Sequence, residues 1–206
     1  MADLFDLLQS QVGDSLVGAL SNKMEGASRE QTSSGVQGAM SILMNALARN
    51  AQNPQAANAL ESALDRDHDG SILEDIAGYI GGTSPINNTR AANGSGILGH
   101  ILGGQQSGAI EALMKVSGLS QSQSGGLLAQ LAPVVLGMLG KQKRSQGLDT
   151  SGLSNILTNS ASTANRKAPQ SSLLTSFLDR DGDGSIADDA LDIGKNLLKN
   201  ILGGKR

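Results

Sequence analysis

LDRDHDGSI at residues 64–72 and LDRDGDGSI at residues 178–186 decide the fold, because they are one motif that occurs twice. The two copies match at eight of nine positions and lie 114 residues apart. A second block repeats as well, since residues 110–139 align with residues 18–47 at a constant offset of 92. The difference between the two offsets is an insertion of 22 residues in the second half. The chain is therefore a diverged internal duplication.

Apolar residues outside the acidic motifs recur at helical spacing. Such stripes run through residues 3–24, 36–48, 55–64 and 125–140, and a short further helix ends at Gly81. No stretch alternates polar and apolar residues in the way that a half-buried strand does. We therefore predict an all-α fold, a duplicated helical bundle with two EF-hand-like DxDxDG calcium loops.

The duplication predicts two helical halves that share one merged core. The first half is residues 1–104 with a calcium loop at 65–75, and the second is residues 105–206 with a calcium loop at 179–189. An Asn-, Ser- and Gly-rich linker is expected at residues 83–96.

The polar insertion is placed at about residues 145–170, which are rich in Ser, Asn and Thr. This composition predicts a flexible loop with at most a short helix at residues 153–157.

Each acidic motif has the sequence of the front half of a calcium-binding helix–loop–helix. In that loop the side chains at positions 1, 3 and 5 and the carbonyl at position 7 bind the ion, and Gly at position 6 makes the turn. Three carboxylates this close repel by about 1 kcal/mol per pair even in water, so a cation between them relieves a cost. We predict two Ca²⁺ sites, with Ca²⁺ preferred over Mg²⁺ because six or seven flexible oxygens suit the larger ion. The predicted metal ligands are Asp65, Asp67, Asp69, Ser71 and Asp75 in the first loop and Asp179, Asp181, Asp183, Ser185 and Asp189 in the second.

The back half of each loop departs from the standard pattern. Position 12 should be a bidentate Glu, but Ile76 and Ala190 stand there. Asp75 and Asp189 occupy position 11 in both copies, which predicts an 11-residue variant closed by aspartate. An aspartate that ligates through one oxygen or through a water would weaken the affinity.

Two longer blocks carry a resemblance to a known family. They are LARNAQNPQAANALESALDRDHDGSILEDIAGYIGG at residues 47–82 and LAPVVLGMLGKQ at residues 131–142. With these blocks the chain resembles, over nearly its whole length, the bacterial YidB-like family, a domain of unknown function. The resemblance implies a bacterial, all-helical, cytosolic protein and transfers no activity.

Composition argues against several classes of function. The chain has no Cys, which excludes disulfides, thiolate zinc sites, iron–sulfur clusters and a cysteine nucleophile. A net charge of −3 and three aromatic residues do not fit a nucleic-acid binder. Because no nucleophile–base pair or phosphate loop is visible, we predict that the protein is not an enzyme.

Several side chains outside the acidic motifs have simple expected roles. His68 is expected at the surface, and His100 in the interior or at an interface. Lys141, Lys143 and Arg144 follow an apolar helix, where they would complement the helix dipole.

The N-terminus MADLFDLLQSQVGDS carries acids where a signal peptide needs basic residues, which predicts a cytoplasmic protein. Residues 125–140 are apolar but shorter than the ~20 residues of a membrane span, and they contain Gln130 and Pro133. This pattern favours a buried core helix over a membrane segment.

The leading hypothesis is a non-enzymatic protein in which two Ca²⁺ ions tie each acidic loop to the helix that follows. Its Gly-rich, aromatic-poor helices suit association with a second copy or another protein. One alternative is a calcium sensor that exposes a Met-rich groove, although helix-spaced Met is more often core, and the missing Glu at position 12 argues against a sensor. The other alternative is a membrane-active protein that uses the uncharged residues 116–140. The Met residues concerned are Met40, Met44, Met114 and Met138.

Overall fold

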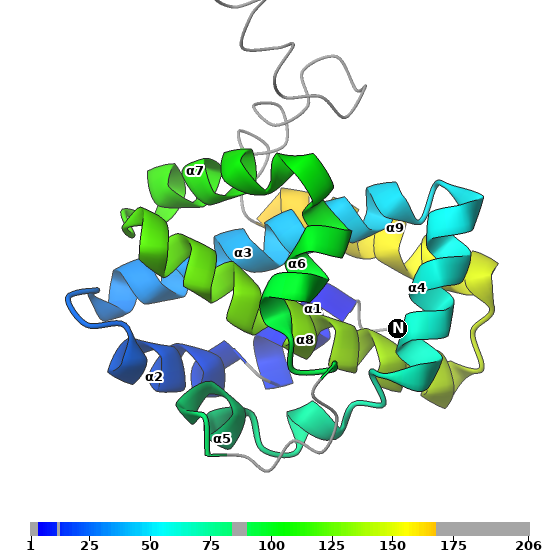
Figure 1. Ribbon diagram of the computed structural model, residues 1–206, viewed down its shortest axis with the longest axis horizontal. Coiled ribbons are helices and arrows are strands. Elements are labelled where there is room, and N and C mark those ends of the chain that lie inside the picture. Colours follow the sequence, from blue (N-terminus) through cyan, green and yellow to red (C-terminus); the bar gives the residue numbers. More distant parts are fainter. Residues whose placement is uncertain (1–3, 12, 84–89, 168–206) are drawn as a thin grey trace, which may run out of the picture.

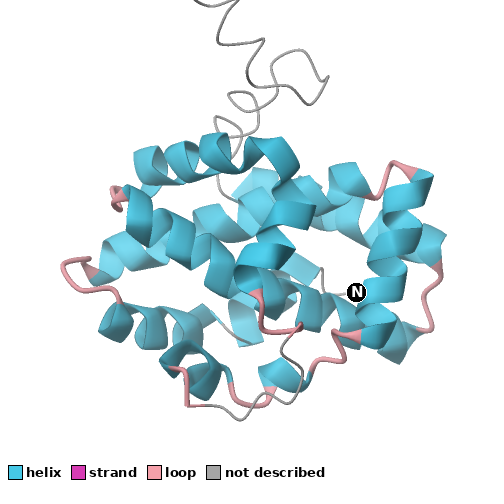
Figure 2. Ribbon diagram, in the orientation of Figure 1, coloured by secondary structure: helices cyan, strands magenta, loops and turns pink. Residues whose placement is uncertain are grey.

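The computed structural model describes residues 4–11, 13–83 and 90–167, and within these residues every regular element is a helix (Figure 2). The all-α prediction is therefore confirmed for the described part of the chain. The elements in order are α1 Leu4–Gln11, α2 Gly13–Lys23, α3 Arg29–Asn50, α4 Pro54–Arg66, η1 Ser71–Leu73, α5 Ile76–Gly81, α6 Gly94–Leu102, η2 Gly103–Gln105, α7 Gln106–Ser117, α8 Gln121–Gln146 and α9 Thr150–Lys167.

The duplication is visible in two matching turns, one between α2 and α3 and one between α7 and α8. Gly26 and Gly118 each adopt a left-handed conformation, with φ of +79° and +69°. Ser28 and Ser120 then cap the following helix, each in a capping box with a glutamine three residues later. Each matched pair is 92 residues apart, so the local turn was kept when the copies diverged.

The capping-box glutamines also join the two halves to each other. Gln31 Nε2 donates to the carbonyl of Gly118 at 2.9 Å, and Gln123 Nε2 donates to the carbonyl of Glu25 at 3.0 Å. Each glutamine thus caps its own helix and bonds to the turn of the other repeat. The N-terminal ends of α3 and α8 therefore meet, and each turn is fixed by the opposite half.

Helices α3 and α8 run through the middle of the molecule, and the other helices pack around them (Figure 1). Buried apolar side chains from α1 to α9 form one continuous cluster. Met40, Met44 and Met138 belong to this cluster, which confirms their predicted core positions, whereas Met114 is half-buried. The core side chains of the two central helices include Val36, Ala39, Leu43 and Leu47 on α3 and Leu128, Leu131, Val134, Val135 and Leu139 on α8.

The predicted buried helix at residues 125–140 lies within α8. Among the described residues, α8 is the one helix long and apolar enough to cross a membrane, but 72% of its most apolar window is buried inside the protein. Burial against the other helices therefore accounts for its apolar sequence, and the core-helix prediction is confirmed.

Residues 150–167 of the predicted insertion form a helix, so the prediction of a flexible loop is wrong for them. Helix α9 is 18 residues long and packs along α3, where Asn45 Nδ2 donates to Asn165 Oδ1 at 2.9 Å. Its buried residues are Leu153, Leu157, Ser160, Ala161, Thr163 and Ala164. Only two of these six side chains are large and apolar, so the helical period is weak in the sequence although the positions are buried.

The helix predicted over residues 3–24 is confirmed as helical over Leu4–Gln11 (α1) and Gly13–Lys23 (α2), and residue 12 lies outside the described residues. The predicted helix at residues 55–64 is confirmed as α4, and the short helix that ends at Gly81 is confirmed as α5.

Candidate functional site

The first acidic motif joins two helices through a tight turn. Asn53 caps α4, and Asp65 lies in the last turn of that helix. Gly70 then adopts φ +89° and ψ −2°, a left-handed conformation that favours glycine, and η1 follows directly. The sharp turn expected at loop position 6 is therefore present between α4 and α5.

The three alternate aspartates of this loop each have a partner within the chain. Asp69 Oδ1 accepts from the Ser71 hydroxyl at 2.6 Å and from the Ser71 backbone N–H at 3.0 Å. These hydrogen bonds hold the pKa of Asp69 below its ordinary value. Asp67 accepts from Arg66 Nε at 3.1 Å, and Asp65 accepts from a lysine of α8. The front half of the loop is thus held by hydrogen bonds of its own.

Within the described ranges, no three acidic or imidazole side chains are grouped as the ligands of a metal ion would be. The structure therefore places Asp65, Asp67 and Asp69 on one loop without bringing their carboxylates to a common point. The remaining predicted ligands, Asp179, Asp181, Asp183, Ser185 and Asp189, lie outside the described residues. Calcium binding by either loop stays a prediction.

Asp75, the predicted closing ligand, is the N-cap of α5. One of its carboxylate oxygens, Oδ1, accepts from the backbone N–H of Gly78 at 2.8 Å. A capping carboxylate of this kind satisfies a backbone donor that the first helical turn leaves unpaired. Asp75 therefore has a structural role as a helix cap in addition to its predicted role as a ligand.

The loop lies directly on α8, at two glycines of that helix. A Cβ atom at Gly140 would overlap the backbone carbonyl oxygen of His68, and one at Gly137 would lie 2.6 Å from the side-chain methyl Cγ2 of Ile72. Only glycine leaves room for the loop backbone at Gly140. Two glycines three residues apart in an otherwise bulky apolar helix are the sequence signal that could have indicated this contact.

Lys143 and Arg144 lie in the last turn of α8, as predicted for residues that complement the helix dipole, and both also reach the loop. Lys143 is 8% exposed, and its Nζ lies 2.6 Å from Asp65 Oδ1 and 3.3 Å from Glu61 Oε1. The hydrogen bond to Asp65 is the main cause that raises the pKa of Lys143. Arg144 Nη2 donates to the carbonyl of His68 at 2.8 Å. These contacts link α8 to residues 61–68.

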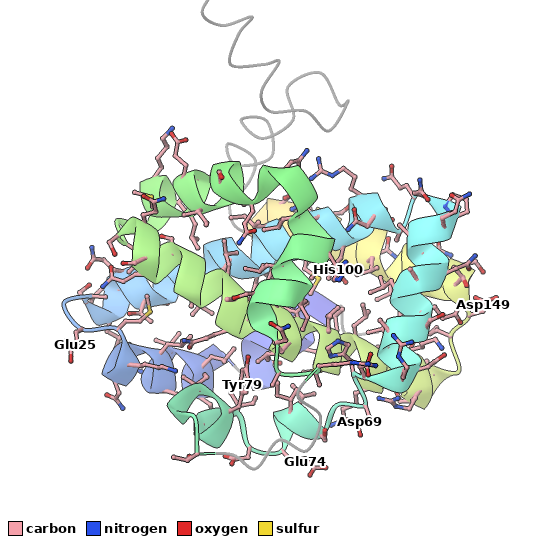
Figure 3. All side chains as sticks on the ribbon, in the orientation of Figure 1. Glu25, Asp69, Glu74, Tyr79, His100 and Asp149 are labelled. Atoms are coloured by element: carbon pink, nitrogen blue, oxygen red, sulfur yellow. The ribbon has the colours of Figure 1, made fainter. Side chains whose placement is uncertain are left out.

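His68 is buried although the sequence predicts it at the surface, and His100 does not lie in the interior, which is one of its two expected environments. His68 is 6% exposed, because the loop lies against α8 and covers it, and this burial lowers the pKa of its imidazole. His100 is exposed on α6 (Figure 3). Neither position could be read from local sequence, since both depend on how the loop and α6 pack against α8.

A small pocket opens beside the loop. Its volume is about 370 Å³. Two of its lining residues, Asp69 and Glu74, lie at the same edge of the molecule (Figure 3). Residues 61–75 hold six carboxylates and one arginine, and α8 adds three cationic side chains next to them, which leaves a formal charge of −2. The pocket is lined by Asp69, Gly70, Ser71, Leu73, Glu74 and Lys141.

A wider and shallower groove lies between α6, α7 and the start of α8. It has a volume of about 750 Å³ and is lined by serine and glutamine side chains together with Leu98, Ile110 and Ala129. None of its lining residues is acidic, basic or a histidine. The groove therefore offers no acid–base pair for catalysis.

Comparison with known proteins gives one match. The model of a family described as a bacterial protein of unknown function (DUF937) matches residues 6–142. This range contains the first acidic loop and ends before the second. No curated protein and no solved structure matches the chain.

Proposed function

The chain belongs to the DUF937 family, a bacterial family of unknown function, and we propose from its own residues that it is a non-enzymatic calcium-binding protein. The predicted resemblance to the YidB-like family is thereby confirmed over residues 6–142, a shorter part of the chain than predicted. In the proposal one Ca²⁺ ion binds in each acidic loop and stabilises the connection between the two helices that flank it. The ion neutralises carboxylate charge and contributes to the free energy of folding.

The observation that carries this proposal is the residual charge of the first loop. Even with the cationic side chains of α8 beside it, the segment keeps a formal charge of −2, which one divalent cation would neutralise. The left-handed Gly70 gives the turn of a calcium loop, and the alternate aspartates have the type and order of side chain that such a loop uses as ligands. Asp65 and Asp69 are exposed, so a cation can reach them from solvent.

A structural role fits the core better than the role of a sensor. A sensor of the EF-hand type exposes a Met-rich groove when calcium binds. Here Met40, Met44 and Met138 are at most 4% exposed and belong to the continuous core. We therefore propose that calcium stabilises this arrangement of helices.

Calorimetric titration with Ca²⁺ tests the proposal. The wild-type chain is expected to bind two ions and to melt several degrees higher at saturating Ca²⁺ than in a chelator, because the ion binds the folded state preferentially. Asp65→Asn combined with Asp179→Asn should remove most of the heat and most of the shift, since each change takes a charged ligand from position 1 of one loop.

A matched control removes two charges elsewhere. Glu25→Gln with Glu111→Gln changes two exposed carboxylates outside the acidic loops and should leave the calcium response unchanged. If the wild type gives no heat and no change in melting temperature at millimolar Ca²⁺, the proposal fails. If the control pair lost as much binding heat and as much of the melting shift as the loop variants, the calcium response would depend on overall charge and not on the loops.

The two roles of Asp75 can be separated by comparing Asp75→Asn with Asp75→Ala. Asparagine caps a helix about as well as aspartate, whereas alanine loses about 1 kcal/mol of capping stability. In chelator we therefore expect Asp75→Asn to melt like wild type and Asp75→Ala to melt lower. If Asp75 is also a ligand, both variants should bind Ca²⁺ at least tenfold more weakly, roughly 1.4 kcal/mol. Unchanged calcium affinity in both would show that the aspartate is a cap alone.

A further inference from the structure

The ammonium group of Lys143 is bound inside the first acidic segment. It lies 2.6 Å from Asp65 Oδ1 and 3.3 Å from Glu61 Oε1, and the residue is 8% exposed. When the offset of 92 is continued four residues past the aligned block, Ala51 stands at the position of Lys143. The lysine is therefore absent from the repeated pattern and belongs to the contact between α8 and this one loop.

We propose that Lys143 is a built-in counter-ion of the first acidic loop, that Ca²⁺ competes with it for Asp65, and that it thereby sets the calcium affinity of this loop. The inference rests on the proposed function and adds its regulation. Lys143 acts here as a positioning residue, because it determines where the carboxylate of Asp65 points and whether it is free.

The competition follows from the chemistry of a shared carboxylate. Asp65 stands at loop position 1, and its oxygen Oδ1 already accepts a charge-assisted hydrogen bond from a buried ammonium. A divalent ion on the same carboxylate must either displace that ammonium or remain beside it, and two cations repel strongly where water is partly excluded. Because Lys143 is part of the same chain, its ammonium group can bind Asp65 again without diffusing from solution. It therefore lowers the apparent affinity of the loop for Ca²⁺.

Lys141 provides a matched comparison on the same helix. It is exposed, carries the same charge and lines the small pocket beside Asp69 and Glu74, but the structure places its amine in no ion pair with Asp65. If positive charge near the loop lowered the calcium affinity only by long-range repulsion, replacing either lysine would raise the affinity by the same amount. Competition for Asp65 would be removed only by replacing Lys143.

The experiment uses the full chain with Asp179→Asn and Asp181→Asn, so that the first loop is titrated with CaCl₂ alone. In this background Lys143→Met keeps the apolar stem and removes the charge. It is expected to bind Ca²⁺ about tenfold more tightly than the parent, whereas Lys141→Met should change the affinity less than about threefold. Melting provides a second readout: Lys143→Met should lower the melting temperature in chelator, and the difference should shrink at saturating Ca²⁺.

The outcomes separate the two proposals. If the parent binds Ca²⁺ and Lys143→Met binds it equally or more weakly, the competition is wrong and the calcium proposal stands. If only Lys143→Met binds, the lysine blocks the loop, which supports the competition. If neither chain binds at millimolar Ca²⁺ and the wild type does not bind either, both proposals are wrong.

Discussion

Alanine at Gly140 is expected to lower the free energy of unfolding by about 3 kcal/mol, because the added Cβ would overlap the backbone carbonyl oxygen of His68. Neither partner is the end of a flexible side chain, so the loop backbone must move away from α8. Hydrogen exchange should then show faster exchange at residues 64–73, and chemical denaturation should give the loss of stability.

Gly126→Ala is the control for this change on the same helix. Gly126 is exposed, and a Cβ there would have no atom within 4 Å. Because alanine favours a helix over glycine, this variant should gain up to about 1 kcal/mol. If Gly140→Ala instead matched Gly126→Ala in stability and in loop exchange, the loop would not be held against α8 as described.

Leu43→Ala is expected to cost about 3 to 4 kcal/mol, since it removes a fully buried side chain and leaves a cavity. Leu43 is 0% exposed on α3, the helix that packs against α2, α6, α7, α8 and α9. Chemical denaturation should show the loss, and the melting temperature should fall by roughly 10 °C.

Gln37→Ala on the same helix is the surface comparison for Leu43→Ala. Gln37 is exposed, and its replacement should change stability by no more than about 0.5 kcal/mol. A loss at Leu43 as small as that at Gln37 would mean that the centre of α3 is not the packed core described above.

The helices that the sequence predicts well are those with bulky apolar stripes. Residues 36–48 and 125–140 carry Leu, Ile, Val and Met at helical spacing, and they form the interiors of α3 and α8. The sequence did not predict helix α9 because four of its six buried residues are alanine, serine or threonine, which give a weak hydrophobic signal. The sequence therefore predicts the helices whose buried residues are large and apolar. It does not predict α9, where small buried residues let the helix pack closely against α3.

The sequence predicts only those features of the candidate site that depend on residues close together in the chain. The turn at Gly70 follows from the order of residues in one motif. The ion pair of Lys143 joins residues 78 apart, and no periodic pattern indicates which basic residue will lie beside Asp65. The burial of His68 has the same cause, because it depends on the docking of the loop against Gly140.

The reciprocal bonds of Gln31 and Gln123 bear on how the chain arose. Each glutamine caps its own helix and reaches the turn of the other repeat, and the two bonds run in opposite directions, to carbonyls one position apart in the aligned turns. A shorter ancestral chain with one repeat could make both bonds with a second copy of itself, in a dimer with two-fold symmetry. Gene fusion would then have turned an interface between two molecules into the middle of one.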